Sequence, residues 1–461
     1  MRKILIGCFL LSISHVALPG QSPVAAQNAR TVPDWLNRGV IYQVWMRSFT
    51  PEGTLYATAT HLPYIADLGA TIVYLSPLNV HGYPSVFGPS TPYEIKDYDM
   101  IDPEYGSEAD LKALVVRAHE LGLKVIMDIV FAHSANDNVL LHKPGFYKRT
   151  PGGELIMSRW RTPQPDFTNP QVCEYFRNNM LHWIRDVGLD GFRADVAGGV
   201  PTSFWDEARD AMDKVNPNVI MLAEADVPEH QLKAYDISYN FPYYAALTAV
   251  VVNGESAERI RQQWEKANAT FPRGSRFLHL NDNHDRNRAD VVFGEKAALA
   301  TSVLNFTLDG IPFLYNGEEV GDTTAPQQQS HVAIRWDIWR PEGQRRASIA
   351  RQQAARLLVF KQLVQMRRDE PALTSGELTW VNNSNLDGVV SFIRKKRDEE
   401  ILVLVNLSNR ITNVEVDVPA SRYAGARDLL KNRTLPASLS PDKLSCRLGA
   451  FDYLVAKRVA R

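Results

Sequence analysis

The chain contains little cysteine and no apolar run long enough for a membrane span. Only three of its 461 residues are cysteines, and Cys8 lies in the apolar stretch at the N-terminus. The other two, Cys173 and Cys446, are far apart and lack the spacing of metal ligands, so neither a disulfide framework nor a zinc site is expected. Beyond the N-terminus no segment approaches the ~20 apolar residues that cross a bilayer. We therefore expect no membrane span.

An excess of charge of either sign is also absent. The 51 basic and 52 acidic residues give a formal net charge of −1, so no overall field attracts the protein to nucleic acid or to an anionic membrane. A neutral or weakly charged ligand is favoured instead. The composition does not indicate an oligomeric state.

The N-terminus has the composition of an export signal. Arg2 and Lys3 precede the apolar run 4–16, and small residues ending in Val24-Ala25-Ala26 follow it. This order of basic, apolar and small residues is typical of a signal peptide that is removed. We predict a signal peptide over residues 1–26 and a secreted or periplasmic mature protein.

Apolar runs of strand length alternate with stretches of helical period, the pattern of repeated β-α units around a parallel sheet. One such helix begins at Ser107, whose spacing to Asp110 predicts a capping box, and ends at Gly122. Eight strands are predicted, which fits a (β/α)8 barrel: Val40 to Met46, Thr71 to Pro77, Lys124 to Val130, Leu189 to Asp195, Val219 to Ala225, Asp236 to Phe241, Arg276 to Asn281 and Pro312 to Tyr315.

Two parts of the chain depart from this alternation. Residues 134–169 are rich in Pro, Gly, Trp and charged residues, which predicts a small inserted domain after the third strand, with the role of an active-site lid. From residue 374 to 461 the apolar period becomes two, which predicts a separate C-terminal domain of antiparallel strands. The barrel would then comprise residues 27–133 and 170–373.

Acidic residues fall where chemistry is found in such barrels, at the carboxyl ends of strands. Asp128, Asp195, Glu224 and Asp285 all lie in or just after predicted strands. The spacings of 29 and 61 positions between the last three correspond to about one and two strand-helix units, so these side chains return to the same rim. A lone Asp at a strand end more often caps a helix, but the convergence of several favours catalysis.

Several short motifs follow one another along the chain. They are Asp128-Ile129-Val130-Phe131-Ala132-His133, Gly191-Phe192-Arg193-Ala194-Asp195, Glu224 within Met221 to Ala225, Asn283-His284-Asp285, Gln164-Pro165-Asp166-Phe167, and Gly310 to Tyr315 with Gly317 and Glu318. These motifs resemble those of the α-amylase family of glycoside hydrolases, and the likeness covers nearly the whole mature chain. The resemblance implies a (β/α)8 barrel, a domain inserted after strand three, a C-terminal β-sandwich, and hydrolysis or transfer of α-glucosidic bonds with retention.

Retaining cleavage requires a carboxylate nucleophile and a protonated carboxyl group roughly 5 to 5.5 Å apart. We assign Asp195 as the nucleophile and Glu224 as the general acid/base. Arg193 precedes Asp195 by two residues, so both side chains face the same way along a strand, and its charge can keep Asp195 ionised. Arg193 can equally form a structural ion pair with Asp128, and the two roles are compatible. Apolar neighbours and the charge of Asp195 should raise the pKa of Glu224.

Further roles follow from the resemblance alone. Asp285 would bind sugar hydroxyls and stabilise the transition state, His133 and His284 would donate hydrogen bonds to the sugar at the cleavage subsite, and Tyr93 would provide a stacking platform. Each histidine could instead satisfy a buried partner. Other aromatic residues are expected mainly to pack in the core or in loops, with some lining outer sugar subsites, and none is assigned: Tyr83, Phe87, Phe146 and Trp160.

The chain departs from the family pattern at three places. Ala132 replaces an Asn that binds calcium in many members, so no cofactor is expected and a structural calcium ion is not supported at the usual site. Glu94 follows Tyr93 where exo-acting α-glucosidases have Asp, which leaves endo and exo action open. Residues 196–201 lack the Lys-His pair of many endo-amylases, which leaves small oligosaccharides open as substrates.

The function predicted from the sequence is retaining hydrolysis of α-1,4-glucans or maltooligosaccharides. An exo-acting α-glucosidase, an oligo-1,6-glucosidase and a glucosyltransferase of the same family are the alternatives, because water and sugar acceptors compete for one intermediate. A catalytically inactive glucan-binding or partner protein is the alternative from a different class. It predicts the loss of a catalytic carboxylate, and all three are present.

Overall fold

The computed structural model describes residues 23–82, 91–339, 342–435 and 443–458. Most of the predicted signal peptide, residues 1–22, lies outside the described residues, as do Tyr83 and Phe87. Within the ranges given above, no helix combines the length and the apolar character that a bilayer span requires. Cys173 and Cys446 are free thiols.

Eight parallel strands close into a barrel, which confirms the predicted fold class. Neighbouring strands follow the order β1-β10-β9-β8-β7-β6-β5-β2, so each strand in chain order pairs with the next, as a (β/α)8 barrel requires. Seven of the eight segments expected from the sequence contain one of these strands, and the eighth begins one residue after the start of β10. Their bounds are β1 (Ile41–Val44), β2 (Ile72–Leu75), β5 (Lys124–Ile129), β6 (Gly191–Ala194), β7 (Ile220–Ala223), β8 (Ile237–Tyr239), β9 (Phe277–His279) and β10 (Ile311–Tyr315).

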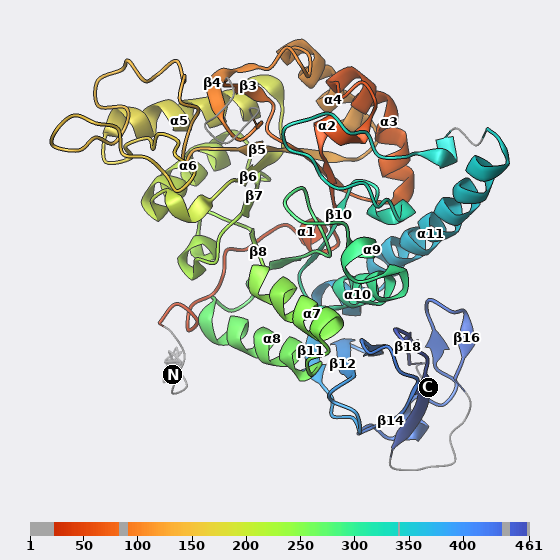
Figure 1. Ribbon diagram of the computed structural model, residues 1–461. Helices are drawn as coiled ribbons and strands as arrows, with labels where there is room; N and C mark the ends of the chain where they lie inside the picture. Colours follow the sequence, from red (N-terminus) through yellow and green to blue (C-terminus); the bar gives the residue numbers. More distant parts are fainter. Residues whose placement is uncertain (1–22, 83–90, 340–341, 436–442, 459–461) are drawn as a thin grey trace, which may run out of the picture.

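Helices cover the outside of the barrel (Figure 1). The capping box of α4 is present as expected: Ser107 Oγ accepts from Asp110 N at 3.2 Å, and Asp110 Oδ2 accepts from Ser107 N at 2.8 Å. The helices are α1 (Asp34–Asn37), α2 (Met46–Phe49), α3 (Leu55–Leu68), α4 (Glu108–Glu120), α5 (Pro170–His182), α6 (Thr202–Val215), α7 (Phe241–Asn253), α8 (Glu258–Thr270), α9 (Ala289–Val292), α10 (Glu295–Thr307), α11 (Gln344–Asp369) and α12 (Pro371–Ser375).

A loop-rich excursion separates β5 from α5. It carries isolated antiparallel bridges such as Tyr147↔Pro165 and Met157↔Pro163 rather than regular strands. Nearby, the short pair β3 (Asn79–His81) and β4 (Ile95–Ile101) is antiparallel and lies outside the barrel sheet. Figure 1 shows the excursion as golden loops projecting beyond α5. Its position above the carboxyl end of β5 brings it to the rim where a barrel enzyme binds substrate.

The C-terminal strands form two antiparallel sheets that share an apolar core, with residues such as Leu404, Val416 and Leu454. A six-stranded sheet has the order β11-β12-β13-β18-β15-β16, and β14 pairs with β17. The strands are β11 (Glu377–Trp380), β12 (Val389–Lys396), β13 (Glu399–Asn406), β14 (Thr412–Val416), β15 (Arg427–Asp428), β16 (Arg433–Thr434), β17 (Leu444–Leu448) and β18 (Tyr453–Lys457).

This C-terminal unit has a core of its own and also packs against the barrel. In β13, Leu402 and Leu404 face the C-terminal core, whereas Val403 and Val405 belong to the hydrophobic cluster of the barrel. Because alternate residues of a strand point to opposite faces, the large sheet is buried on both sides. Arg394 of β12 also donates to the carbonyl of Thr307 at 2.8 Å, at the end of α10.

Close packing of β6 against β7 depends on Gly191, the first residue of the strand that carries the proposed nucleophile at its far end. Gly191 has φ +153°, and a Cβ atom there would lie 1.9 Å from the carbonyl oxygen of Ile220. No side chain fits at that distance. The register Gly191↔Ile220 in turn sets Ala194 beside Ala223, immediately before Asp195 and Glu224.

We expect Gly191→Ala to destabilise the protein by more than about 4 kcal/mol, because the barrel must open to admit the methyl group. Gly122→Ala is the matched control. Gly122 also has a positive φ, +76°, but a Cβ there meets nothing within 4 Å, so only the left-handed conformation is penalised, by about 1–2 kcal/mol. Thermal unfolding at one scan rate compares the two. Equal losses would contradict the role assigned to the contact with Ile220.

Candidate active site

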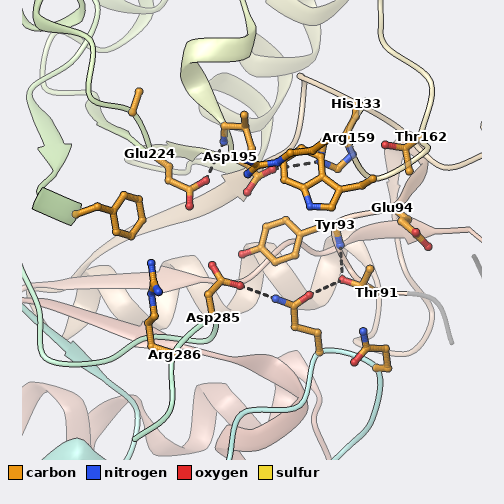
Figure 2. A pocket seen from close by; sticks show the side chains of 16 residues that line it. Thr91, Tyr93, Glu94, His133, Arg159, Thr162, Asp195, Glu224, Asp285 and Arg286 are labelled. Atoms are coloured by element: carbon orange, nitrogen blue, oxygen red, sulfur yellow. Dashed lines mark hydrogen bonds and ion pairs between the residues drawn. The ribbon is translucent and has the colours of Figure 1, made fainter. Parts of the chain in front are cut away.

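A pocket of about 720 Å³ opens at the carboxyl end of the barrel strands. Figure 2 shows Asp195, Glu224 and Asp285 pointing into one space, with Tyr93 and His133 at its wall. The lining residues come from loops after six of the barrel strands and from the excursion after β5: Thr91, Tyr93, Glu94, His133, Arg159, Trp160, Thr162, Asp195, Val196, Glu224, Ala225, Phe241, Asp285, Arg286, Gln328 and Gln329.

Arg193 lies beneath the pocket with no exposed side-chain surface and contacts three carboxylates. Its Nη1 donates to both oxygens of Asp128, at 2.7 and 2.8 Å, and to Asp195 Oδ1 at 2.9 Å. Its Nη2 lies 2.9 Å from Glu224 Oε2. Burial alone would lower the pKa of Arg193, but Asp128 and Glu224 raise it well above its usual value. The predicted ion pair with Asp128 and the predicted contact with Asp195 thus coexist.

Asp195 is buried and nevertheless ionised. Burial acts to raise its pKa, whereas the charge of Arg193 and the side chain of His133 act to lower it, and the pKa is lowered overall. His133 Nε2 lies 3.5 Å from Asp195 Oδ2. Nucleophilic attack on an anomeric carbon requires an ionised carboxylate, and Asp195 provides one at the pocket floor.

Glu224 has the opposite protonation preference although it shares Arg193 with Asp195. The pKa of Glu224 is raised to about 7 overall, because burial and the negative charge of Asp195 raise it by more than Arg193 lowers it. The Val196 amide donates to Glu224 Oε2 at 2.9 Å. Two neighbouring carboxyl groups whose environments move their pKa values apart are suited to the roles of nucleophile and acid.

Asp285 is the most exposed of the three carboxylates, with 36% of its side chain accessible. Burial acts to raise its pKa, but His284 and Arg193 lower it below the usual range for Asp. His284 Nε2 lies 3.2 Å from Asp285 Oδ2. Gln328 Nε2 donates to Asp285 Oδ1 at 2.6 Å. Asp285 is therefore a second fixed negative charge beside the pocket, available to sugar hydroxyls.

Tyr93 and His284 form one wall of the site. Their rings stack with centroids 5.3 Å apart, and the Tyr93 hydroxyl contacts both Asp128 Oδ2 at 2.8 Å and His284 Nε2 at 2.6 Å. Gln43 Nε2 donates to His284 Nδ1 at 2.8 Å, so Nε2 of His284 carries the hydrogen. Five of the seven residues singled out from the sequence thus line one pocket, and the other two, Arg193 and His284, lie buried behind its surface.

Sequence reasoning left out two residues that line this pocket. Trp160, taken as packing or an unassigned outer subsite, is 37% exposed and its ring lies 5.0 Å from that of His133. Gln328 comes from the loop after β10, where no motif marks it. A Trp in a loop-rich insertion between Arg159 and Arg161 is a signal that could have been used, since exposed aromatic rings stack on sugars. Phe146, by contrast, is buried.

The residues at the family's usual calcium position do not fit a metal ion. The side chain of Ala132 offers no ligand atom, and its methyl group lies beside Gly199, which has no side chain to offer one. Within the described ranges, His81, Asp102 and Glu104 hold possible ligand atoms within 4.8 Å of one another. Arg47 donates to both Glu104 oxygens, at 2.7 and 2.9 Å, so a cation would have to displace a guanidinium group.

Comparison with known proteins agrees with this geometry. The model of the α-amylase catalytic domain matches residues 26–150 and 155–341. The chain belongs to the α-amylase family. A cyclomaltodextrinase of Geobacillus thermopakistaniensis is 26% identical, over 89% of this chain and 76% of that protein. Neopullulanase 2 of Thermoactinomyces vulgaris is also 26% identical, over 90% and 77%.

Solved structures show the same fold. A maltogenic α-amylase, AmyB from Thermotoga neapolitana, superposes with a TM-score of 0.81 at 24% identity, over 92% of this chain and 100% of that one. An α-amylase from Lactobacillus plantarum superposes with a TM-score of 0.77 at 25% identity, over 93% and 100%. As a member of the α-amylase family, this chain is a glycoside hydrolase.

The pKa values predict a pH dependence for this family member. We expect kcat/KM for maltotriose to fall as the pH rises through about 7, the pKa of Glu224, because the acid must carry its proton when it meets the substrate. The acidic limb should lie below the usual range of Asp, because the pKa of Asp195 is lowered. Initial rates from about pH 2 to about pH 9 measure both limbs.

The control is α-glucosyl fluoride, whose fluoride departs without a proton from the enzyme. Its first-turnover rate should keep the acidic limb and lose the alkaline one. An alkaline limb at the same pH for both substrates would contradict the assignment of the limb to a general acid.

Proposed function

We propose that this glycoside hydrolase cleaves α-1,4-linked glucans or maltooligosaccharides with retention, with Asp195 as nucleophile and Glu224 as general acid/base. The observation that carries this proposal is the shared contact of Arg193, whose two terminal nitrogens reach Asp195 Oδ1 and Glu224 Oε2, both at 2.9 Å. One cation thereby holds the two carboxyl groups side by side. Their pKa values are nonetheless shifted in opposite directions.

In the first step, a carboxylate oxygen of Asp195 attacks the anomeric carbon while Glu224 passes its proton to the departing glycosidic oxygen. The bond to the leaving sugar breaks, and a glycosyl ester on Asp195 forms. Glu224 becomes a carboxylate. Since Asp195 loses its charge in the ester, the field that opposes ionisation of Glu224 weakens at the moment when Glu224 gives up its proton.

In the second step, Glu224 removes a proton from water, and the water oxygen attacks the anomeric carbon on the side that the first sugar left. Asp195 departs as a carboxylate and regains its contact with Arg193. Asp285, ionised and a third exposed, is placed to bind sugar hydroxyls and to stabilise positive charge on the ring in both transition states. His133 and His284 would donate hydrogen bonds to the same sugar, and Tyr93 would stack on it.

We propose short or cyclic maltooligosaccharides as the preferred substrates. Gln328 donates to Asp285 and accepts from Thr91 Oγ1 at 3.3 Å, so its side chain spans two parts of the pocket wall. Glu94 lines the same pocket. Such a bounded pocket suits a short chain better than a long open groove does. The names of the cyclomaltodextrinase and neopullulanase relatives support the same class.

Two alternatives share this site. Transfer to a sugar hydroxyl in place of water needs the same glycosyl ester, so a glucosyltransferase would have the same first step. An exo-acting α-glucosidase or oligo-1,6-glucosidase would differ only in how the pocket grips the terminal sugar. A catalytically inactive binding protein is disfavoured, because all three carboxylates are present and meet in one pocket.

We further propose that the protein is exported to the periplasm or the medium. The support is the sequence alone: two basic residues, an apolar stretch and small residues before Gln27. A fusion of residues 1–30 to a reporter enzyme, compared with a fusion that lacks them, tests the export.

We also propose that catalysis requires no metal ion, since the proposed mechanism uses only side chains and position 132 offers no ligand. Prolonged dialysis against a chelator should then change neither kcat nor the melting temperature appreciably. A melting temperature lowered by about ten degrees or more would correspond to several kcal/mol and would contradict the proposal. Readdition of calcium is the control, and recovery of the lost stability would identify the ion.

The decisive test of the proposed function is Glu224→Gln. The amide cannot donate the acid's proton, so cleavage of maltotriose should slow by a factor of roughly 10² to 10⁴, whereas the first turnover of an aryl α-glucoside with a weakly basic leaving group should slow much less. A residue that only stabilises the transition state would slow both substrates alike. Equal losses would therefore remove Glu224 from the acid role.

Azide provides the matched control. It attacks the glycosyl ester without a general base, so it should restore turnover of the aryl glucoside by Glu224→Gln and yield the retained product, α-glucosyl azide. The same addition should not rescue Asp195→Asn, because without the ester there is no intermediate for azide to intercept. Rescue of Asp195→Asn with retention would contradict the nucleophile assignment.

A further inference from the structure

The residue after the nucleophile has a backbone conformation that its side chain disfavours. Val196 has φ +43° and ψ +47°, in the left-handed region. Among the described residues, five other than glycine have a positive φ, and Val196 is the β-branched one. In this region a branched side chain crowds its own backbone, so such a residue is rare and its strain is tolerated only where the surroundings hold it.

This conformation turns two successive amides toward Glu224. Val196 N donates to the carboxylate oxygen Glu224 Oε2 at 2.9 Å, and Ala197 N donates to the main-chain oxygen of Glu224 at 3.2 Å. A strand that continued past Ala194 would alternate the directions of its amides. The left-handed conformation of Val196 instead ends β6, and the amides of Val196 and Ala197 both donate to Glu224, just after β7.

The turn that follows keeps Val196 in place. Gly199 N donates to the Val196 carbonyl at 2.8 Å, and Trp205 Nε1 of α6 donates to the Ala197 carbonyl at 3.0 Å. Ala197 itself is buried. The strain at Val196 is thus offset by the hydrogen bonds that Gly199 and Trp205 donate to this turn, and such support is the condition under which a strained residue persists.

We propose that Val196 is a positioning residue for the general acid: its strained backbone aims an amide hydrogen at Glu224 Oε2, so that the proton delivered to the substrate resides on Oε1. The inference rests on the proposed role of Glu224. Val196 N donates to Oε2, and the charged Arg193 Nη2 lies 2.9 Å from the same oxygen, so Oε2 faces a donor and a cation and is the less favourable place for the hydrogen. Oε1 is left as the protonated atom on the substrate side.

The amide also adjusts the strength of the acid. A hydrogen bond donated to a carboxylate favours its ionised form, and the Val196 amide accordingly acts to lower the pKa of Glu224 against the upward effect of burial. The other charged and titratable groups around Glu224 are Arg193 and Asp195 from β6, Tyr239 from β8, and Asp285 and Arg286 after β9. None of them changes when the single amide hydrogen is removed.

The test replaces the amide between Asp195 and Val196 by an ester, through incorporation of the α-hydroxy analogue of valine at position 196. This removes the N–H and keeps every side chain. Since the carboxylate loses a stabilising donor, the pKa of Glu224 should rise, and the alkaline limb of kcat/KM for maltotriose should move to higher pH by about one unit. The first turnover of α-glucosyl fluoride, which needs no acid, should change much less.

The matched control is the same exchange at Ala197, whose N–H meets the main-chain oxygen of Glu224 and not its carboxylate. This ester should leave the alkaline limb in place. Alkaline limbs at the same pH for the two esters would overturn the proposal. A chain that folds with the ester at position 197 but not with the ester at position 196 would also overturn it, because the Val196 amide would then be structural. Failure of the proposed function itself is distinguishable, since it shows in Glu224→Gln as equal losses for both leaving groups.

The strain is measured separately with ordinary amino acids. Val196→Gly and Val196→Ala both lose the isopropyl group, but only glycine adopts a positive φ without a steric penalty. Val196→Gly should therefore melt at a higher temperature than Val196→Ala, while both retain the amide hydrogen and the alkaline limb of the wild type. The reverse order of melting temperatures, or a limb displaced in both variants, would overturn the proposal.

Discussion

A single buried guanidinium group organises the carboxyl end of the barrel. Arg193 contacts Asp128, Asp195 and Glu224 and has no exposed side-chain surface. Removing such a group from water costs several kcal/mol, and this cost is offset only when its partners are also buried and well oriented. Asp128 fulfils this condition, because the hydroxyls of Tyr74 and Tyr93 donate to it at 2.7 and 2.8 Å. The main effect of Arg193 and its partners is therefore to fix the positions of the carboxyl groups, rather than to add to the stability of the fold.

The same cation explains how two neighbouring carboxyl groups come to differ in protonation. The positive charge of Arg193 and the contact with His133 stabilise the ionised form of Asp195, so the pKa of Asp195 is lowered despite its burial. Glu224 shares Arg193, but it also experiences the charge of Asp195, and burial dominates, so its pKa rises to about 7. The cation keeps both groups in place, whereas their other neighbours decide which one carries the proton. That difference is what retaining cleavage demands of a carboxyl pair.

The sequence alone indicated the barrel and the convergence of its carboxylates, because both depend on local periodicity and on the spacing of strand ends. The capping box at Ser107 followed from spacing as well. Gln328 was out of reach, since the path of its loop is set by tertiary contacts such as that of Arg47 with the Gln328 carbonyl. Trp160 gave a usable signal as an aromatic residue in a loop-rich insertion, but its place beside His133 depends on the path of that loop. The left-handed Val196 was hidden for the opposite reason: valine is the residue that local propensity would least place there.

The C-terminal strands show what a period of two leaves open. It predicted antiparallel strands, and the continuous apolar run in β13 reflects burial on both faces, one against the barrel and one against β14 and β17. Continuous apolar strands are expected wherever both faces of a sheet are covered. Which layer covers each face is a tertiary property, and the one-dimensional pattern does not contain it.

The central claim is that Asp195, held by Arg193, becomes covalently bound to the sugar. The most direct measurement is to trap this ester with a 5-fluoro-α-glucosyl fluoride, which forms the intermediate readily and releases it slowly, and then to locate the added mass by peptic digestion and tandem mass spectrometry. The account predicts one equivalent of fluorosugar on the peptide that contains Asp195. A label on Glu224 or Asp285, or fluoride release without any labelled peptide, would contradict it.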